Sequence, residues 1–109
     1  MSMGKNAQII RMDGHGVPEI LDAILRVFPL DTYIEKPVNL MEVMPGDDVQ
    51  TPIWDVYKKT VEKYDERGKN AIGEIERFKF YEETKTAYAV IATSEKALYA
   101  NIMLQKGVV

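Results

Sequence analysis

The sequence predicts an α/β fold in which helices cover a sheet. Apolar residues recur at helical spacing in residues 18–28 and again in residues 52–64. Two later runs, AYAVIAT at residues 87–93 and YANIMLQ at residues 99–105, are apolar at nearly every position, as strands buried on both faces are. The expected order is strand, helix, strand, helix, helix, strand, strand, which is an α/β pattern. No repeat, low-complexity tract or linker divides the chain, so we expect a single domain over residues 1–109.

The first expected strand covers residues 7–12 (AQIIRM). Pro18 lies in the first turn of the helix that follows, where proline is tolerated, and Pro29 ends that helix. The residues that form its core-facing stripe are Ile20, Leu21, Ile24, Val27 and Phe28. A second strand is expected at residues 38–44 (VNLMEVM).

Thr51 is the expected N-cap of the next helix, and Pro52 is its first residue. Gly68 is expected to end this helix, because glycine adopts the left-handed conformation that stops helices. The residues on its apolar face are Ile53, Tyr57, Val61 and Tyr64.

A third helix is expected over residues 75–85 (IERFKFYEETK), with Ile75, Phe78 and Tyr81 on one face. We expect the strand at residues 87–93 to be covered on both faces, with Tyr88 in the core. A sheet of four strands is thin for strands this apolar. Part of its surface is therefore expected to meet another chain, or a part of the fold outside these residues.

The composition excludes several classes of function. The 14 basic and 17 acidic residues give a net charge of −3, which argues against a nucleic-acid binder with its concentrated basic surface. The absence of cysteine excludes disulfides, thiol nucleophiles and cysteine–zinc sites, and a lone histidine is too few for a histidine metal cluster. No apolar run approaches the ~20 residues of a membrane span, and the first residues lack an apolar signal core. The expected compartment is the cytoplasm.

Asp31 is the candidate for acid/base chemistry. It follows the end of a helix, where the negative end of the helix dipole disfavours an ionised carboxylate. A carboxyl group in such a place suits proton exchange with a substrate. The alternative is that Asp31 simply stabilises the turn it lies in, as aspartates often do.

Four side chains in the C-terminal third suit a polar ligand. Arg77 begins a helix, against the preference of the dipole, so it is a candidate for holding a ligand hydroxyl; otherwise it is a solvated or ion-paired arginine. Tyr81 and Tyr99 flank the apolar strand near its ends, where pockets of α/β sheets form, although both suit a core position equally. Asn101 needs hydrogen-bond partners if it is buried, either backbone groups or a ligand.

Other residues carry weaker signals. Met41 and Met44 suit the core, although a methionine can also back a sugar ring. His15 stands in a loop with no second histidine and no triad around it. No dinucleotide-binding, P-loop or nucleophile-elbow motif is present. The residues alone therefore predict an α/β domain with a polar pocket near Asp31, Tyr81, Tyr99 and Asn101.

Seven stretches follow one another in a recognisable order: IIRMDGHGVPEIL, PLDTYIEKP, LMEVMPGD, QTPIW, IERFKFYE, IATSEKALYAN and QKGV. In their order and spacing the chain resembles the RbsD/FucU family of sugar mutarotases, on the L-fucose mutarotase side, over nearly its whole length. The resemblance implies a ring-shaped homo-oligomer, often a decamer, with sugar sites at subunit contacts. It also implies interconversion of the α and β anomers of a free sugar, which requires proton transfers but no metal, cofactor or covalent nucleophile.

The resemblance also assigns roles to residues. Asp31, in LDTY, corresponds to an acid/base residue. The side chains that correspond to sugar contacts are Met41, Arg77, Tyr81, Tyr99 and Asn101. In these roles Met41 and the aromatic rings supply apolar walls, while Arg77 and Asn101 supply directional hydrogen bonds.

Three departures from the family pattern bear on function. Family members carry a further N-terminal helix and strand with a His-Gly-Asp motif, whose histidine donates a proton, and His15 lies in a different motif. We expect the chain to be a shortened form of such a protein rather than a naturally reduced relative. Ala100 and Ser94 stand at usual glycine positions, and the YAN triplet is closer to the D-ribose pyranase branch. The open alternatives are therefore D-ribose pyranase activity and a non-catalytic, sugar-binding ring protein.

Overall fold

The computed structural model describes residues 8–107 of the chain. In order along the chain, its elements are β1 (Gln8–Met12), α1 (Val17–Val27), β2 (Val38–Met41), α2 (Pro52–Tyr64), the 3-10 turn η2 (Gly68–Ala71), β3 (Ile72–Ile75), α3 (Arg77–Lys85), β4 (Ala89–Thr93) and β5 (Ile102–Leu104). The mixture of helices and strands confirms the predicted α/β class. The part of the first predicted strand that precedes Gln8 lies outside the described residues.

The strands form two sheets rather than the single four-stranded sheet that the sequence suggested. β1 and β4 pair in parallel, with Ile10 opposite Ile91. In the second sheet β2 lies in the centre, parallel to β3 and antiparallel to β5. β3 was not predicted, because IGEI is short and its last residue was assigned to the helix that follows.

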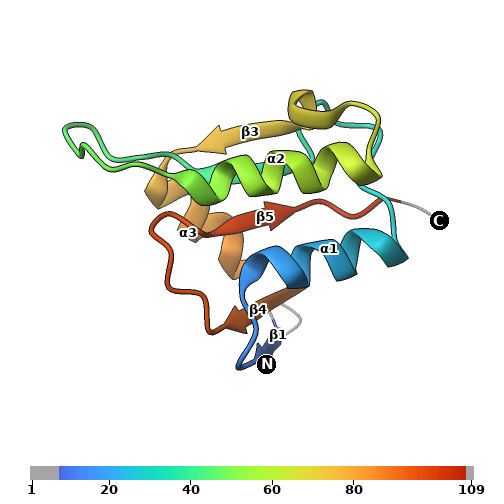
Figure 1. The fold of residues 1–109 in the computed structure, drawn as a ribbon, viewed down its shortest axis with the longest axis horizontal. Helices are drawn as coiled ribbons and strands as arrows, with labels where there is room; N and C mark the ends of the chain where they lie inside the picture. The colour runs from blue at the N-terminus through green and yellow to red at the C-terminus, as the bar shows by residue number, and fades with distance from the viewer. Residues whose placement is uncertain (1–7, 108–109) are drawn as a thin grey trace.

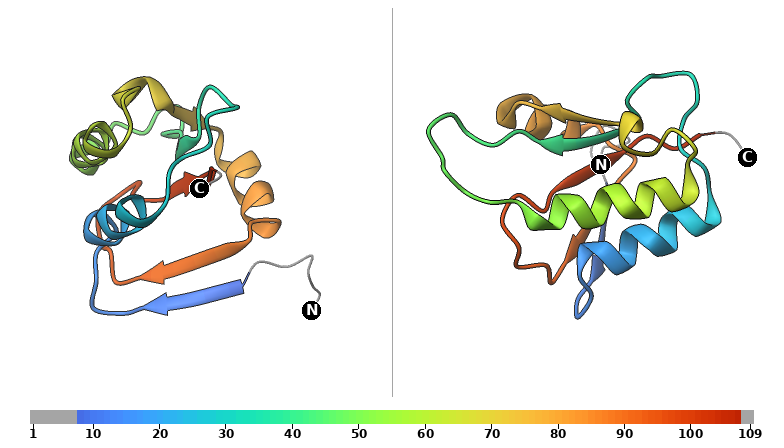
Figure 2. Two further views of the ribbon diagram at one scale, coloured as in Figure 1. Left: turned by 90° about the vertical axis from the view of Figure 1, so that its right-hand side faces the viewer. Right: turned by 45° about the horizontal axis from the view of Figure 1, so that its top comes forward.

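The three-stranded sheet lies between helices. Figure 2 shows α1 and α2 side by side on one face of this sheet and α3 on the other, with the β1–β4 pair beyond α1. The core lies between the first two helices and the sheet. Its fully or nearly fully buried side chains include Leu21, Val38, Leu40, Tyr57 and Val61. None of the helices in residues 8–107 is long and apolar enough to cross a membrane.

Helix α2 ends earlier than predicted. Its last residue is Tyr64, four residues before Gly68. The carboxylate of Asp65 accepts hydrogen bonds from the backbone and side-chain nitrogens of Arg67, and this local turn replaces the helical hydrogen bonds. Gly68 still adopts a left-handed conformation, with φ of 56°, but there it opens η2.

Helix α3 buries a different face from the one predicted. It begins at Arg77, because the Glu76 carboxylate caps it by accepting from the backbone nitrogens of Phe78 and Lys79. Phe80 is the buried side chain of this helix, whereas Phe78 is 68% exposed. The prediction of the buried face was wrong because it treated Ile75 as part of the helix, whereas Ile75 belongs to β3.

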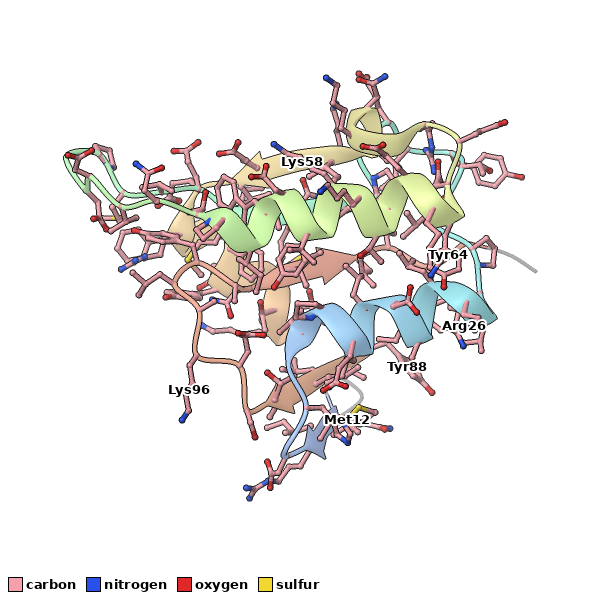
Figure 3. The ribbon with its side chains drawn as sticks, in the orientation of Figure 1. Met12, Arg26, Lys58, Tyr64, Tyr88 and Lys96 are labelled. Carbon is pink, nitrogen blue, oxygen red and sulfur yellow. The ribbon has the colours of Figure 1, made fainter. Side chains whose placement is uncertain are left out.

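The β1–β4 sheet is more exposed than predicted. Every residue of β4 is half-buried rather than buried, and Ile9 on β1 is 71% exposed. Tyr88, predicted to lie in the core, is 89% exposed and is labelled in Figure 3. An apolar strand is covered on both faces only when other elements flank it, and residues 8–107 supply too few.

Candidate functional site

The candidate site lies at one edge of the three-stranded sheet. The parallel strands β2 and β3 end side by side there, with Met41 opposite Ile75, and the Glu42 nitrogen donates to the Ile75 carbonyl at 2.8 Å. β5 runs the other way, with Ile102 opposite Leu40, so β5 begins at this edge. In Figure 1 this is the end of the sheet from which the long loop between β2 and α2 projects. The edge thus joins segments that are far apart in the sequence.

This topology brings four of the predicted residues to the same edge. Met41 is the last residue of β2 and is 2% exposed. Asn101, exposed, immediately precedes β5, and Arg77 begins α3 two residues after β3 ends. Tyr99 precedes Asn101 by two residues. An apolar floor, an amide and a guanidinium thus gather in a small region.

Arg77 and Tyr81 belong to the first turns of α3, where they are four residues apart and so share a face of the helix. The Nε atom of Arg77 is buried but has no hydrogen-bond partner within residues 8–107. Buried polar atoms are normally satisfied, so this nitrogen calls for an acceptor from a ligand or from another chain. Tyr81 is 46% exposed and so remains available for contact.

The backbone around Tyr99 is held in an unusual conformation. Tyr99 has a φ of 54°, the left-handed region that side chains other than glycine rarely adopt. Two side chains of α2 fix the neighbouring carbonyls: Trp54 Nε1 donates to the Tyr99 carbonyl at 2.8 Å, and the Tyr57 hydroxyl donates to the Ala100 carbonyl at 2.6 Å. Burial raises the pKa of Tyr57, so its hydroxyl remains a donor. These two hydrogen bonds hold the strained backbone in place, and strained residues of this kind cluster at functional sites.

The hydroxyl of Tyr99 is held from the loop that follows β2. It donates to Asp47 Oδ2 at 2.8 Å and accepts from the Met44 nitrogen at 3.2 Å. Asp47 lies in a turn in which its own nitrogen donates to the Met44 carbonyl. The loop and the segment before β5 are therefore joined through one phenol group.

Asp31 does not join the other predicted residues within one chain. Its nitrogen donates to the Gln105 carbonyl, beyond the far end of β5, and its carboxylate accepts from the Tyr33 nitrogen in a tight turn. Four residues of extended chain separate Gln105 from Asn101, a span of about 13 Å. Within one chain, Asp31 and Asn101 therefore lie near opposite ends of β5.

Arg67 fixes the connection that carries Asp31. Its guanidinium donates to the carbonyls of Asp31 and Ile34 at 3.0 and 3.1 Å, and it also pairs with the Asp65 carboxylate at 2.8 Å. The hydrogen bonds from Arg67 lower the pKa of Asp65. Asp65 and Arg67 line a hollow in the surface together with Thr32, Tyr64 and Glu66.

A separate charged cluster joins α1 and α2. The Asp22 carboxylate accepts hydrogen bonds from Tyr64, Lys63 and Arg26. Figure 3 shows Arg26 near Tyr64. The hydrogen bond from Tyr64, followed by that from Lys63, lowers the pKa of Asp22. The cluster joins the two helices away from the sheet edge. Within residues 8–107, no group of three or more histidine or acidic side chains could hold a metal ion.

Three residues that support the site were not singled out from the sequence. Tyr57 was predicted only as part of an apolar face, and neither Trp54 nor Asp47 was assigned a role. A usable signal for Trp54 and Tyr57 was present in the sequence. Their polar tips lie about one helical turn apart and need hydrogen-bond partners when the rings are buried. Nothing in the local sequence connects Asp47 to Tyr99, which lies 52 residues away.

Comparison with known proteins places the chain in a family. The model of the RbsD / FucU transport protein family matches residues 2–109. The human fucose mutarotase is 47% identical over 102 residues, which cover 91% of this chain and 65% of that protein. The chain thus spans just under two thirds of this relative's length.

Solved structures agree with this assignment. A crystal structure of FucU from Bifidobacterium longum shares 65% identity with a TM-score of 0.93, covering 97% of this chain and 74% of that one. The fucose mutarotase from Streptococcus pneumoniae in complex with L-fucose shares 43% identity with a TM-score of 0.88, covering 95% of this chain and 73% of that one. Because the match extends over nearly all of the sequence and the fold, the chain belongs to the RbsD / FucU transport protein family.

Proposed function

We propose that the chain forms the sugar-binding core of an L-fucose mutarotase, an isomerase that interconverts the α and β anomers of the free sugar. The observation that carries the proposal is the gathering of Met41, Arg77, Tyr99 and Asn101 at one sheet edge. The human relative and the fucose-bound relative are both fucose mutarotases, which supports L-fucose as the sugar.

The side chains at this edge suit a monosaccharide. Mutarotation opens the ring when the ring oxygen gains a proton and the anomeric hydroxyl loses one, and closure on the other face gives the second anomer. In our proposal Arg77 and Asn101 orient sugar hydroxyls through their donors, with Arg77 Nε supplying one of them. The ring of Tyr81, which is 46% exposed, provides apolar surface for a face of the sugar, while the buried Met41 ends the strand at this edge.

Asp31 requires a second chain in this proposal. It lies at the opposite end of β5 from Asn101, and we propose that its carboxylate acts on a sugar held by a second copy, at a site that forms where two copies meet. The exposed apolar surface of the β1–β4 sheet supports such self-association. We propose a ring of identical subunits, a decamer as the family resemblance implies, acting in the cytoplasm.

Saturation-transfer NMR tests the proposed activity. One anomeric proton of L-fucose is irradiated, and the loss of signal at the other anomer reports the exchange rate, with D-ribose measured in parallel. We expect the chain to accelerate exchange of L-fucose more than that of D-ribose. Exchange at the buffer rate for L-fucose, with faster exchange for D-ribose, would identify a ribose pyranase instead.

A second outcome separates catalysis from binding. Saturable binding of L-fucose without faster exchange would contradict the mutarotase proposal and identify a non-catalytic sugar-binding protein. The Asp31→Asn variant tests the acid/base role, because an amide cannot take up the proton. We expect its exchange rate to fall at least tenfold; full activity of this variant would rule out the role for Asp31.

A further inference from the structure

We propose that Asp47 is a positioning residue that makes the Tyr99 hydroxyl an acceptor, and never a donor, toward the bound sugar. The inference rests on the proposed function and adds a requirement for the sugar group that faces Tyr99. It comes from the hydrogen bonds of one phenol group and from the way its backbone is held.

The direction of each hydrogen bond follows from the chemistry of its partner. An ionised carboxylate carries acceptors alone, so the proton in the 2.8 Å contact between Tyr99 and Asp47 Oδ2 comes from the phenol. A backbone nitrogen carries a donor alone, so the phenol oxygen accepts in its 3.2 Å contact with Met44. A hydroxyl has one proton and two lone pairs. One lone pair therefore remains for a ligand, and no proton does.

Tyr99 cannot easily turn away to free its proton. Its φ of 54° and the hydrogen bond from Trp54 fix its backbone, while Tyr57 fixes the next carbonyl from the buried side of α2. A charge-assisted hydrogen bond is also about twice as strong as one between neutral groups, so the phenol proton stays with Asp47. The phenol therefore presents the same lone pair to each incoming sugar.

The consequence is a rule of selectivity. A sugar hydroxyl facing Tyr99 must donate its proton, and a group that can accept but not donate is rejected, because two acceptors then face each other. Fluorine is such a group, and it is close to a hydroxyl in size. Without Asp47, the phenol proton is free to turn toward the sugar, and the rejection disappears.

A panel of L-fucose analogues tests this rule. In each analogue one hydroxyl, including the anomeric one, is replaced by fluorine, and its dissociation constant is compared with that of L-fucose for the wild-type chain. We expect one position of the panel to bind about tenfold more weakly, the cost of one lost hydrogen bond. In Asp47→Ala the penalty at that position should shrink to threefold or less.

Two further variants separate positioning from damage to the loop. Asp48→Ala removes the neighbouring carboxylate, which is exposed, and should keep the wild-type pattern. Asp47→Asn retains an oxygen that can accept from Tyr99, so it should restore part of the penalty, which a disordered loop would not do. The inference is overturned if Asp47→Ala discriminates at every position as the wild-type chain does.

A measurement without sugar distinguishes the two proposals. Hydrogen exchange of the Met44 amide should be slow in the wild-type chain and faster in both Tyr99→Phe and Asp47→Ala, because the phenol holds that amide. Weak or absent L-fucose binding with this protection intact would overturn the proposed function and, with it, the rule of selectivity. Unchanged Met44 exchange in both variants would overturn the positioning of Tyr99 itself.

Discussion

Tyr99 shows how single residues couple the site to the core. Its hydroxyl donates a hydrogen bond to Asp47 in the loop after β2, and its carbonyl accepts one from Trp54. The carbonyl of the next residue accepts a hydrogen bond from the buried Tyr57. A left-handed backbone costs a residue with a side chain roughly 1 kcal/mol or more, which these contacts must offset. Stability and binding geometry therefore depend on the same few side chains.

Tyr57→Phe should lower the free energy of unfolding by about 1–2 kcal/mol, because it leaves the Ala100 carbonyl without its partner in a buried place. Urea unfolding followed by circular dichroism measures this change. Tyr33→Phe is the matched control, since Tyr33 is 90% exposed and should unfold as the wild-type chain does. Equal stability of the two variants would show that the hydroxyl of Tyr57 contributes nothing.

Arg77→Lys should weaken L-fucose binding at least tenfold while leaving the urea midpoint nearly unchanged. Lysine keeps the charge but lacks the Nε donor, which is buried and unpartnered within residues 8–107. Calorimetric titration with L-fucose gives the affinity, and Arg11→Lys, on the exposed strand β1, serves as the control. A loss of stability equal to the loss of binding would instead give Arg77 a structural role.

At the scale of elements, α2 and the turn that follows it organise both ends of the sheet. Trp54 and Tyr57, in the first half of α2, hold the segment before β5. Beyond the other end of α2, Arg67 holds the carbonyls of Asp31 and Ile34 while pairing with Asp65. A shift of this helix would therefore move the proposed sugar contacts and Asp31 together.

The ion pair between Asp65 and Arg67 predicts a specific response to acid. Hydrogen bonds from Arg67 place the folded pKa of Asp65 below its ordinary value of 3.8. The carboxylate therefore adds its full stability above that value, and the addition is lost as the pH falls from 3.8 through the folded pKa. In urea unfolding between pH 6 and pH 2, Asp65→Asn should be less stable than the wild-type chain at pH 6.

This difference should shrink as the pH falls below 4, because protonation removes the same interaction from the wild-type chain. Asp13→Asn, which alters an exposed pair on the other sheet, should show no comparable convergence. A constant difference between Asp65→Asn and the wild-type chain down to pH 2 would contradict the role assigned to the ion pair.

At the scale of the whole molecule, the two sheets differ in how completely they are covered. The three-stranded sheet lies between helices, and most of the buried residues lie on this sheet or on the helices α1 and α2 that cover it. The β1–β4 sheet leaves Ile9 and Ile10 exposed, and Tyr88 lies just before it. Apolar surface of this kind usually marks a contact with another molecule.

Replacing Ile9 with lysine should therefore weaken self-association. Sedimentation velocity of the wild-type chain should show larger species as its concentration rises, and Ile9→Lys should shift this rise to higher concentration. Val56→Lys, which alters an exposed apolar residue of α2, is the control and should assemble as the wild-type chain does. A wild-type chain that stays monomeric throughout would contradict the proposed ring.

The sequence by itself determined the α/β class, the helices that became α1 and α2, and the central parts of most strands. These features follow from local periodicity and from proline and glycine positions, which act within a few residues. The family resemblance also named Met41, Arg77, Tyr99 and Asn101, which the fold brings to one edge.

The tertiary structure alone decided what depends on distant contacts. Periodicity within one segment cannot specify which surfaces face each other in the folded chain. This pairing of surfaces decides that Phe80 is buried in place of Phe78, that Tyr88 is exposed, and that the strands divide into two sheets. The separation of Asp31 from Asn101 follows from the antiparallel direction of β5, and the bond from Tyr99 to Asp47 joins residues 52 positions apart. Such features arise when the chain folds back on itself, because only then do the groups that satisfy one another come within reach.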